Sequence, residues 1–448
     1  MENTTTPGEA LGRRMLRFAL PYLLAYFLQT VYGMADLFII GQYQGAAGTT
    51  AVAIGSQVMH MITVMLVGLA MGVTVSVGQA AGAGDRPRIG VLVGNTILLF
   101  AGCSVVLALG LMAGVGPVVS LMSTPSQAME GTRTYLLICF VGIPFITAYN
   151  VLASIFRGLG DSKRPLYFVA AACAANIGLD YLFIGGLGLG PAGAALGTVL
   201  SQGFSVVLAL AVLHRSAGML RLRWEDLRPQ RGAMGQILSI GVPVAVQDGL
   251  IQVSFLLITI IANRRGLVDA AAVGVVEKII SFLFLVPSSM LSTVSALGAQ
   301  SIGAGRWEEA DRMLRRAIGL GLGFGAVVAL GMQGAAPLVL RPFTADAAVV
   351  AAGVPYIRGY VFDCLFAGVQ FSFSGYFCAC GRSELSFLHN ILSMVLVRVP
   401  GAYLASVLFP DTLLPMGLAS AMGSLFSSLV CAVLCHRLRK QGKLTAAR

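Results

Sequence analysis

The chain has 448 residues, of which 57% are apolar and only 11% are charged, and its mean hydropathy is +0.84. Soluble proteins carry about a quarter charged residues, so this composition excludes an ordinary soluble enzyme. The 48 residues between Asp36 and Asp85 contain no Asp, Glu, Lys or Arg, which is more than twice the ~20 residues that one helix needs to cross a bilayer. We therefore predict an all-α integral membrane protein.

Apolar runs separated by charges, Pro/Gly clusters and polar turns predict twelve transmembrane helices in two bundles of six. The expected spans are residues 16–40, 50–80, 89–114, 134–156, 166–185 and 191–213, followed by 237–262, 270–298, 314–335, 352–379, 386–408 and 413–436. This pattern predicts an N-lobe at 1–213, a basic cytoplasmic linker at 214–236, and a C-lobe at 237–448 that ends in a cytoplasmic tail.

The distribution of basic residues predicts the orientation in the membrane. With the N-terminus in the cytoplasm, 23 of the 30 Lys and Arg residues fall in cytoplasmic segments, and four fall in the opposite loops: Arg133, Arg264, Arg265 and Arg341. Lys and Arg are enriched on the cytoplasmic side of membrane proteins. We therefore expect a multi-pass protein of the cell (inner) membrane with both termini in the cytoplasm, and we attribute the net charge of +11 to topology rather than to nucleic-acid binding.

The two halves of the sequence repeat each other. The segment FALP that ends at Pro21 matches IGVP, which ends at Pro243, and GQAAGAG at 78–84 matches AQSIGAG at 299–305. GDSK and GAAL in the first half similarly match GRSE and GLAS in the second half. Six spans in each half relate the two bundles by a pseudo-two-fold axis along the membrane normal, which is a common design of secondary transporters.

Polar groups inside the spans are the candidates for function, because an ionisable group there costs roughly 2.5–3.5 kcal/mol to insert. The first half offers Asp36, Asn150, Asn176, Asp180 and Thr198. Asn176 and Asp180 are four residues apart and share one helix face. Carboxylate, amide and hydroxyl oxygens suit sodium, or protons shared between carboxyls, and do not suit zinc or copper. These residues predict a cation- or proton-coupling site.

The second half lacks these polar groups at the matching positions, which hold Ile258, Phe371, Val397, Gly401 and Met422. If the fold required the polar groups, the second half should retain some of them. The asymmetry therefore favours function over hydrogen bonding between helices, which is the structural alternative.

The second half has its own charged residues within spans: Asp248, Glu277, Lys278, Arg358, Asp363 and Arg398. Functional and structural roles are both open for them. Asp248, Glu277 and Asp363 are the candidates for contacts in a central cavity, and Asp248 and Asp363 have no obvious partner nearby in the sequence. At the start of the first helix of each half, Pro21 and Pro243 remove a backbone hydrogen bond, and we expect bending at Pro21.

Several motifs together resemble the multidrug and toxic compound extrusion (MATE) family: YGMADLFIIGQYQG with Asp36, the loops GQAAGAGD and AQSIGAGR, and SIFRGLGDSKRP. The resemblance spans about residues 15–436. It implies two six-helix lobes around a V-shaped cavity and export of drugs driven by sodium or proton entry. It also implies a cation site in the N-lobe at Asp36, Asn176, Asp180 and Thr198, with Asn150 nearby, and sodium is one candidate for the bound ion. Members of the family bend their first helix near a proline such as Pro21.

The sequence departs from one branch of this family, which carries an acidic pair on its seventh and tenth helices. Here Asp248 matches the seventh helix only loosely, and Asp363 lies too far before the turn at Gly381. The departure argues against ion coupling through the C-lobe.

We therefore expect a secondary antiporter that exports amphipathic, often cationic organic compounds by alternating access, in exchange for proton or sodium influx. The alternative is a flippase for lipids or lipid-linked oligosaccharides of the same superfamily, which would need an arginine-lined cavity for a pyrophosphate group. An enzyme would need a nucleophile–base set or a metal motif such as HExxH, which the sequence lacks. We expect no cofactor and no nucleic-acid partner, and a monomer in the lipid bilayer.

Overall fold

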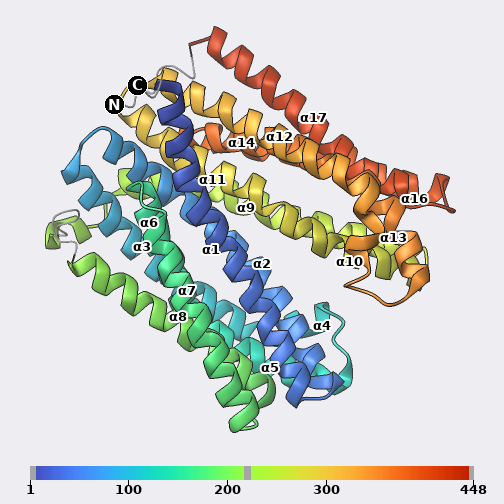
Figure 1. Ribbon diagram of the computed structural model, residues 1–448. Helices are drawn as coiled ribbons and strands as arrows, with labels where there is room; N and C mark the ends of the chain where they lie inside the picture. The colour runs from blue at the N-terminus through green and yellow to red at the C-terminus, as the bar shows by residue number, and fades with distance from the viewer. Residues whose placement is uncertain (1–6, 216–222, 443–448) are drawn as a thin grey trace, which may run out of the picture. The chain divides into compact units, whose positions relative to one another are not determined.

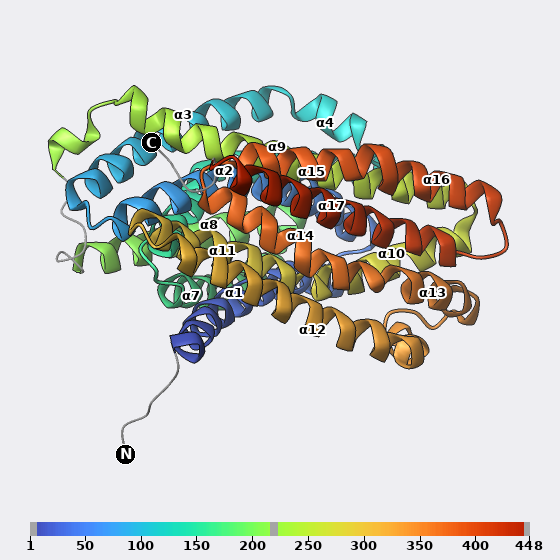
Figure 2. The ribbon, with the colours of Figure 1, turned by 90° about the horizontal axis from the view of Figure 1, so that it is seen from above.

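The computed structural model describes residues 7–215 and 223–442, which form a set of long helices (Figures 1 and 2). The elements of the first half are α1 (Pro7–Tyr43), α2 (Ala46–Gly82), α3 (Arg86–Ala113), α4 (Val115–Leu121), α5 (Ser126–Val141), α6 (Ile143–Gly158), α7 (Lys163–Asp180), the π-helical η1 (Tyr181–Gly186) and α8 (Gly190–Arg215). After the short 3₁₀ helix η2 (Trp224–Leu227) come α9 (Arg231–Asn263), α10 (Leu267–Leu283), α11 (Leu285–Gly303), α12 (Trp307–Leu340), α13 (Ala347–Tyr360), α14 (Phe362–Ala379), α15 (Ser383–Ser393), the π-helical η3 (Met394–Arg398), α16 (Val399–Leu408) and α17 (Leu414–Lys440).

Among the described residues, eleven helical segments are long and apolar enough to cross a membrane, and α5 with α6 supplies a twelfth if this bent pair is one span. The helix axis bends by 50° between α5 and α6. Pro144 lies in the first turn of α6 and cannot donate the hydrogen bond that would continue α5, which explains the break. The prediction of an all-helical, multi-pass membrane protein is confirmed, and the bend falls within the predicted span 134–156.

The helix boundaries repeat with the same spacing as the sequence motifs. Helix α2 covers residues 46–82, and α10 with α11 covers 267–303, which is 221 residues later at both ends. The start of α12 follows the start of α3 by the same number, and the end of α14 follows the end of α6 by the same number. The two halves of the chain are therefore built from corresponding helices.

The chain forms two compact units, which differ from the predicted lobes at their boundaries. The N-unit consists of residues 20–245, and the C-unit consists of residues 246–448 together with the chain up to Ala19. Thus α1 begins in the C-unit and continues in the N-unit, whereas α9 begins in the N-unit and continues in the C-unit. Each of the two helices changes unit beside its internal proline, Pro21 in α1 and Pro243 in α9.

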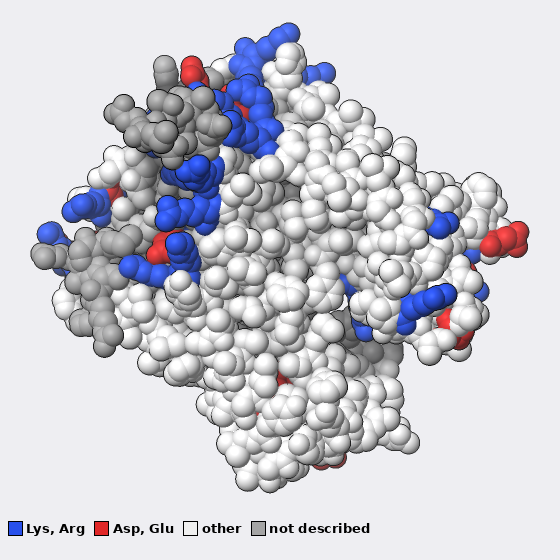
Figure 3. Space-filling view, in the orientation of Figure 1, with Lys and Arg blue, Asp and Glu red and all other residues white. Residues whose placement is uncertain are grey.

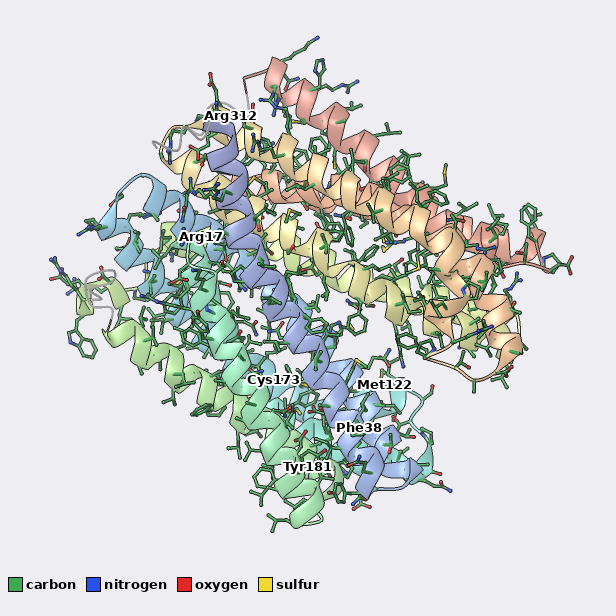
Figure 4. The ribbon with its side chains drawn as sticks, in the orientation of Figure 1. Arg17, Phe38, Met122, Cys173, Tyr181 and Arg312 are labelled. Atoms are coloured by element: carbon green, nitrogen blue, oxygen red, sulfur yellow. The ribbon has the colours of Figure 1, made fainter. Side chains whose placement is uncertain are left out.

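Side-chain contacts explain why the start of α1 belongs to the C-unit. Arg14 donates from Nη1 to Glu309 Oε1 at 2.9 Å and from Nη2 to Gln300 Oε1 at 3.2 Å. Glu309 is on α12 and Gln300 is on α11, so the arginine ties three helices together. Figure 4 labels Arg17 on α1 and Arg312 on α12 in this region.

Close backbone packing explains why the start of α9 belongs to the N-unit. A Cβ atom at Gly72 of α2 would lie 2.1 Å from Ile237 O, and one at Gly241 would lie 2.2 Å from Leu69 O. The two helices therefore touch through their backbones at these glycines, which no larger residue would permit.

The predicted linker 214–236 is shorter in the structure, because α9 already begins at Arg231. Residues 216–222 of this linker and residues 443–448 of the predicted tail lie outside the described part of the chain. The described part of the linker is held against α3 by the buried Asn95, whose Nδ2 donates to Arg228 O at 3.2 Å and whose Oδ1 accepts from Gln230 N at 2.7 Å.

Within the C-unit, α11, α12 and α14 lie side by side (Figures 1 and 2). Helices α12 and α14 meet at Gly321 and Gly368, where a Cβ on either glycine would lie 2.7 Å from the backbone of the other. Such small-residue contacts let membrane helices pack closely where the hydrophobic effect does not drive association.

Basic residues gather at one end of the N-unit, where α3 and α7 begin and α6 ends (Figure 3). They are Arg86, Arg88, Arg157, Lys163 and Arg164. Arg133 on α5 is the basic residue that the sequence assigns to the opposite side of this unit. The charge asymmetry on which the predicted orientation depends is therefore present in the folded N-unit.

Candidate functional site

Three helices of the N-unit, α1, α7 and α8, supply the polar residues of the candidate site. Asp36 comes from α1, Asn176 and Asp180 from α7, and Thr198 from α8. Asp180 is the last residue of α7 before the π-helical turn η1, and such turns in membrane and soluble helices occur frequently at functional sites. In Figure 4, Phe38 marks α1 next to Asp36, and Cys173 and Tyr181 mark α7 and η1 around Asn176 and Asp180.

The structure brings these four side chains together. Thr198 Oγ1 donates to Asp36 Oδ2 at 3.3 Å, and the side chains of Asn176 and Asp180 also interact with Asp36. Asp36, Asn176 and Asp180 are buried, with exposed fractions of 3%, 1% and 0%. The cluster therefore places two carboxyl groups next to each other inside the N-unit.

Most oxygen atoms of the two carboxyl groups lack a hydrogen-bond donor among the described residues. Asp36 Oδ1, both oxygens of Asp180, and both the oxygen and the nitrogen of the Asn176 carboxamide are buried and have no hydrogen-bond partner there. Two buried carboxylates without counter-charges are very unfavourable, because desolvation and mutual repulsion both oppose the charged form. The cluster can therefore balance its charge with a proton shared between the carboxyls or with a small cation held by their oxygens.

Gly197, next to Thr198 on α8, allows Asp180 to approach this helix. A Cβ atom at Gly197 would lie 2.2 Å from Asp180 Oδ1 and 3.6 Å from Asn176 Nδ2. The carboxylate thus occupies the volume that any other side chain would fill. The sequence alone does not indicate this glycine, because its importance depends on a residue of another helix.

We predict that Gly197→Ala weakens cation binding at the cluster, because the added methyl group must displace the Asp180 carboxylate or separate α7 from α8. Overpacking of this kind costs about 1–3 kcal/mol, so we expect the affinity of the cluster for a small cation to fall about 5- to 150-fold. The measurement is ion-dependent export in vesicles. Gly203→Ala on the same helix is the control, since its Cβ would meet Phe145 at an ordinary distance of 3.8 Å. Equal ion dependence in both variants would show that the close approach is unimportant.

Asn150 is placed differently from the other candidates. It is buried in α6, and its Nδ2 donates to Ile146 O in its own helix at 2.8 Å. This bond is one that a polar residue commonly makes within a membrane helix for structural reasons. The proposal that Asn150 assists the cation site thus has less geometric support than the proposal for the other four residues.

The polar cluster continues along α1 and α8 beyond the predicted residues. Tyr32 lies one turn before Asp36, Gln202 lies one turn after Thr198, and the two side chains interact. The i, i+4 spacing that linked Asn176 to Asp180 in the sequence also links these pairs. Applying this spacing to α1 and α8 would have found both residues.

The candidate residues of the C-unit lie in different environments. Asp248 on α9 is half-buried, and Glu277 on α10 is half-buried and accepts a hydrogen bond from Thr259 at 3.4 Å. Asp363 on α14 is fully buried and forms an ion pair with Arg398, a partner 35 residues away that the sequence did not reveal. The ion pair gives Asp363 a partner within the C-unit and weakens the case for it as a cavity contact.

Comparisons with known proteins agree with this architecture. The profile of the family described as MatE matches residues 21–182 and 243–404, two segments whose starts are separated by the spacing of the internal repeat. A Bacillus subtilis protein named as the probable multidrug resistance protein YpnP is 27% identical over 436 residues, which are 96% of this chain and 95% of that protein. The FAD transporter of Shewanella oneidensis is 25% identical over 98% of this chain and 97% of its own length.

A solved structure described as the outward-facing conformation of a multidrug resistance MATE family transporter has the same fold. It superimposes with a TM-score of 0.90 at 21% sequence identity, over 99% of this chain and 100% of that one. Because the family profile matches both halves, the chain belongs to the MatE family, the multidrug and toxic compound extrusion transporters, and is a membrane transporter rather than an enzyme.

Proposed function

We propose that this protein exports amphipathic, often cationic organic compounds by alternating access, in exchange for protons or sodium ions that bind at Asp36, Asn176, Asp180 and Thr198. The observation that carries the proposal is the burial of Asp36 and Asp180 side by side, with most of their oxygen atoms lacking a donor among the described residues. Such a site is stable only when it holds a proton or a cation. The ion that occupies it is then the ion whose gradient drives transport.

The position of Asp36 on α1 offers a way to couple ion binding to a conformational change. This helix passes from the C-unit to the N-unit beside Pro21, where the backbone lacks one hydrogen-bond donor. A change of charge at Asp36 alters how strongly the second half of α1 is held against α7 and α8. The helix is therefore the element through which ion binding in the N-unit would favour one conformation over another.

The proposed substrates are organic molecules of the kind that the relatives' names indicate. Multidrug resistance is in the name of the Bacillus subtilis relative, and FAD is in the name of the Shewanella oneidensis relative. The buried cluster of the N-unit is acidic, whereas a flippase for lipid-linked oligosaccharides would need a basic lining for the pyrophosphate group. A fluorescent organic cation is therefore the first compound to test, and FAD, which carries a pyrophosphate group of its own, is the anionic compound to compare with it.

Transport by purified protein in lipid vesicles, with imposed sodium and proton gradients tested separately, is the decisive experiment. We expect one of the two gradients to drive uptake or release of the dye, and the other to have little effect at matched membrane potential. Transport that is equal with and without both gradients would contradict the proposed antiport. Dye transport that requires ATP would contradict it as well.

We also propose that both termini face the cytoplasm. The support is the excess of Lys and Arg at the end of the N-unit where α3 and α7 begin, which by the positive-inside rule is the cytoplasmic end. A reporter that fluoresces only in the cytoplasm, fused after the last residue, should be fluorescent. A reporter that is active only outside the inner membrane should be inactive at the same position, and the reverse pattern would contradict the orientation.

A further inference from the structure

The C-unit contains a second group of buried charged residues, contributed by α14, η3 and α10. Arg398, the last residue of η3, pairs with the fully buried Asp363, and its own side chain is only 13% exposed. Its guanidinium carbon lies 5.6 Å from the centre of the Phe255 ring, and the group also interacts electrostatically with Glu277. The guanidinium group therefore pairs with one carboxylate, lies over an aromatic ring and is within electrostatic range of a second carboxyl group.

The surroundings of Arg398 contain several buried polar atoms without a hydrogen-bond partner among the described residues, and its own Nε is one of them. Asp363 Oδ1 and Glu277 Oε1 are buried without a hydrogen-bond partner among the described residues. The hydroxyls of the fully buried Tyr356 and Tyr360 interact with the same charged residues and likewise have no partner in the described chain. An oxygen-rich environment of this kind is suited to a positive charge.

The local backbone explains how Arg398 reaches this position. A π-helical turn inserts an extra residue into the helix and redirects the side chains that follow. A Cβ atom at Gly423 of α17 would lie 3.1 Å from Arg398 Cβ, so the glycine makes room for the start of this side chain. In the first half the corresponding fifth span also has a π-helical turn, which directly follows Asp180. The fifth span thus supplies an acidic group in the N-unit and a basic group in the C-unit.

We propose that Arg398 is the resident cation of the C-unit, with its guanidinium group holding the positive charge that Asp363 and Glu277 would otherwise take from solution. Arg398 would thus hold the two carboxyl groups in place and keep the charge of the C-unit constant, while the charge of the N-unit changes with ion binding. It is a positioning residue in this sense, since it touches no transported ion. The assignment of ion exchange to the N-unit rests on the function proposed above, whereas the state of the C-unit does not.

Removal of the Arg398 side chain should create a vacant cation site of a defined shape. Arg398→Ala leaves Asp363 as an uncompensated buried charge, which is strongly unfavourable, and vacates the place of the guanidinium group beside the Phe255 ring. Free guanidinium has the planar shape and the fork of donors of the missing group, whereas sodium and potassium do not. The variant should therefore bind guanidinium selectively.

The test is thermal unfolding of the purified full-length protein in detergent. We expect Arg398→Ala to unfold at least about 5 °C below the wild type. Guanidinium chloride at about 20 mM, far below the molar concentrations that unfold proteins, should recover at least about half of this loss, and equal sodium or potassium chloride should recover much less. The unfolding temperature of the wild-type protein should not rise when guanidinium chloride is added.

Arg439→Ala is the matched control. Arg439 also pairs with an aspartate, Asp311, but both side chains of that pair are partly exposed, at 37% and 28%. Water can solvate Asp311 when the arginine is removed, so we expect no stabilisation by guanidinium in this variant. The same guanidinium response in both variants would overturn the proposal, because the response would then reflect a general effect on the protein.

The double variant Arg398→Ala/Asp363→Asn provides a second test if the single variant cannot be purified. Removing both charges together should restore the unfolding temperature to within about 2 °C of the wild type and abolish the guanidinium response. A double variant that is as unstable as the single variant, or a single variant that does not respond to guanidinium, would overturn the proposal. These measurements involve the C-unit alone, so they can fail while ion coupling at Asp36 stands, and they can succeed if that coupling fails.

Discussion

Asp36→Asn should abolish ion-driven export while leaving a folded protein in the membrane. The substitution keeps the volume of the side chain and the hydrogen bond from Thr198 Oγ1, but it removes the charge that a proton or cation must balance. Allosteric coupling energies of about 1–3 kcal/mol correspond to effects of up to ~150-fold, so we expect gradient-driven dye export to fall by about 100-fold. The measurement is the initial rate of export in vesicles with the effective ion gradient imposed.

The control for this variant is Asp411→Asn, which neutralises a carboxylate in the exposed loop before α17 and should export at the wild-type rate. Asp36→Asn should also remain able to bind the dye, since the proposed site binds the ion and not the organic substrate. A well-expressed Asp36→Asn protein with undiminished, gradient-dependent export would show that ion coupling lies elsewhere.

The fold was largely predictable because a membrane imposes few choices on a chain. Apolar runs of about 20 residues between charged loops can satisfy their backbone only as helices, so the spans and the internal repeat followed from hydropathy and motif spacing. The boundary between the two units could not be predicted in this way. It depends on contacts such as Arg14 with Glu309 and Gly241 with Leu69, which join residues far apart in the sequence.

The candidate site of the N-unit was predictable because charged groups inside a membrane are rare and costly. Asp36 and Asp180 stood out for this reason, and the helical spacing of Asn176 and Asp180 placed the latter two on one face. The contribution of Gly197 was not predictable, since the sequence does not show which helix approaches a glycine. The C-unit was harder for the same reason: the pairing of Asp363 with Arg398 depends on a π-helical turn that no sequence pattern indicated.

Asp180→Asn should produce the same loss of export as Asp36→Asn, and the double variant should be no worse than either single variant. The two carboxyl groups share one cluster, so removing either one leaves a site that can no longer exchange the same charge. Residues that act as a unit show effects that do not add, and we expect all three variants to lose about 100-fold in export rate. Rates measured in the same vesicles, under the same gradient, give this comparison directly.

For the same three variants we also predict the effect on the unfolding temperature, which would have the opposite sign if the two carboxyl groups had a purely structural role. If Asp36 and Asp180 served only to hold α1, α7 and α8 together, replacing them would lower the unfolding temperature. If instead the cluster stores two unfavourable carboxylates for function, neutralising one should leave the unfolding temperature of the protein without coupling ion unchanged or raise it by a few degrees, since ~1–4 kcal/mol is typical when buried charges are replaced. Added coupling ion should then stabilise the wild type and not the double variant. A marked drop in the unfolding temperature of both single variants, together with additive losses of export, would assign the pair to packing and remove the basis for ion exchange in the N-unit.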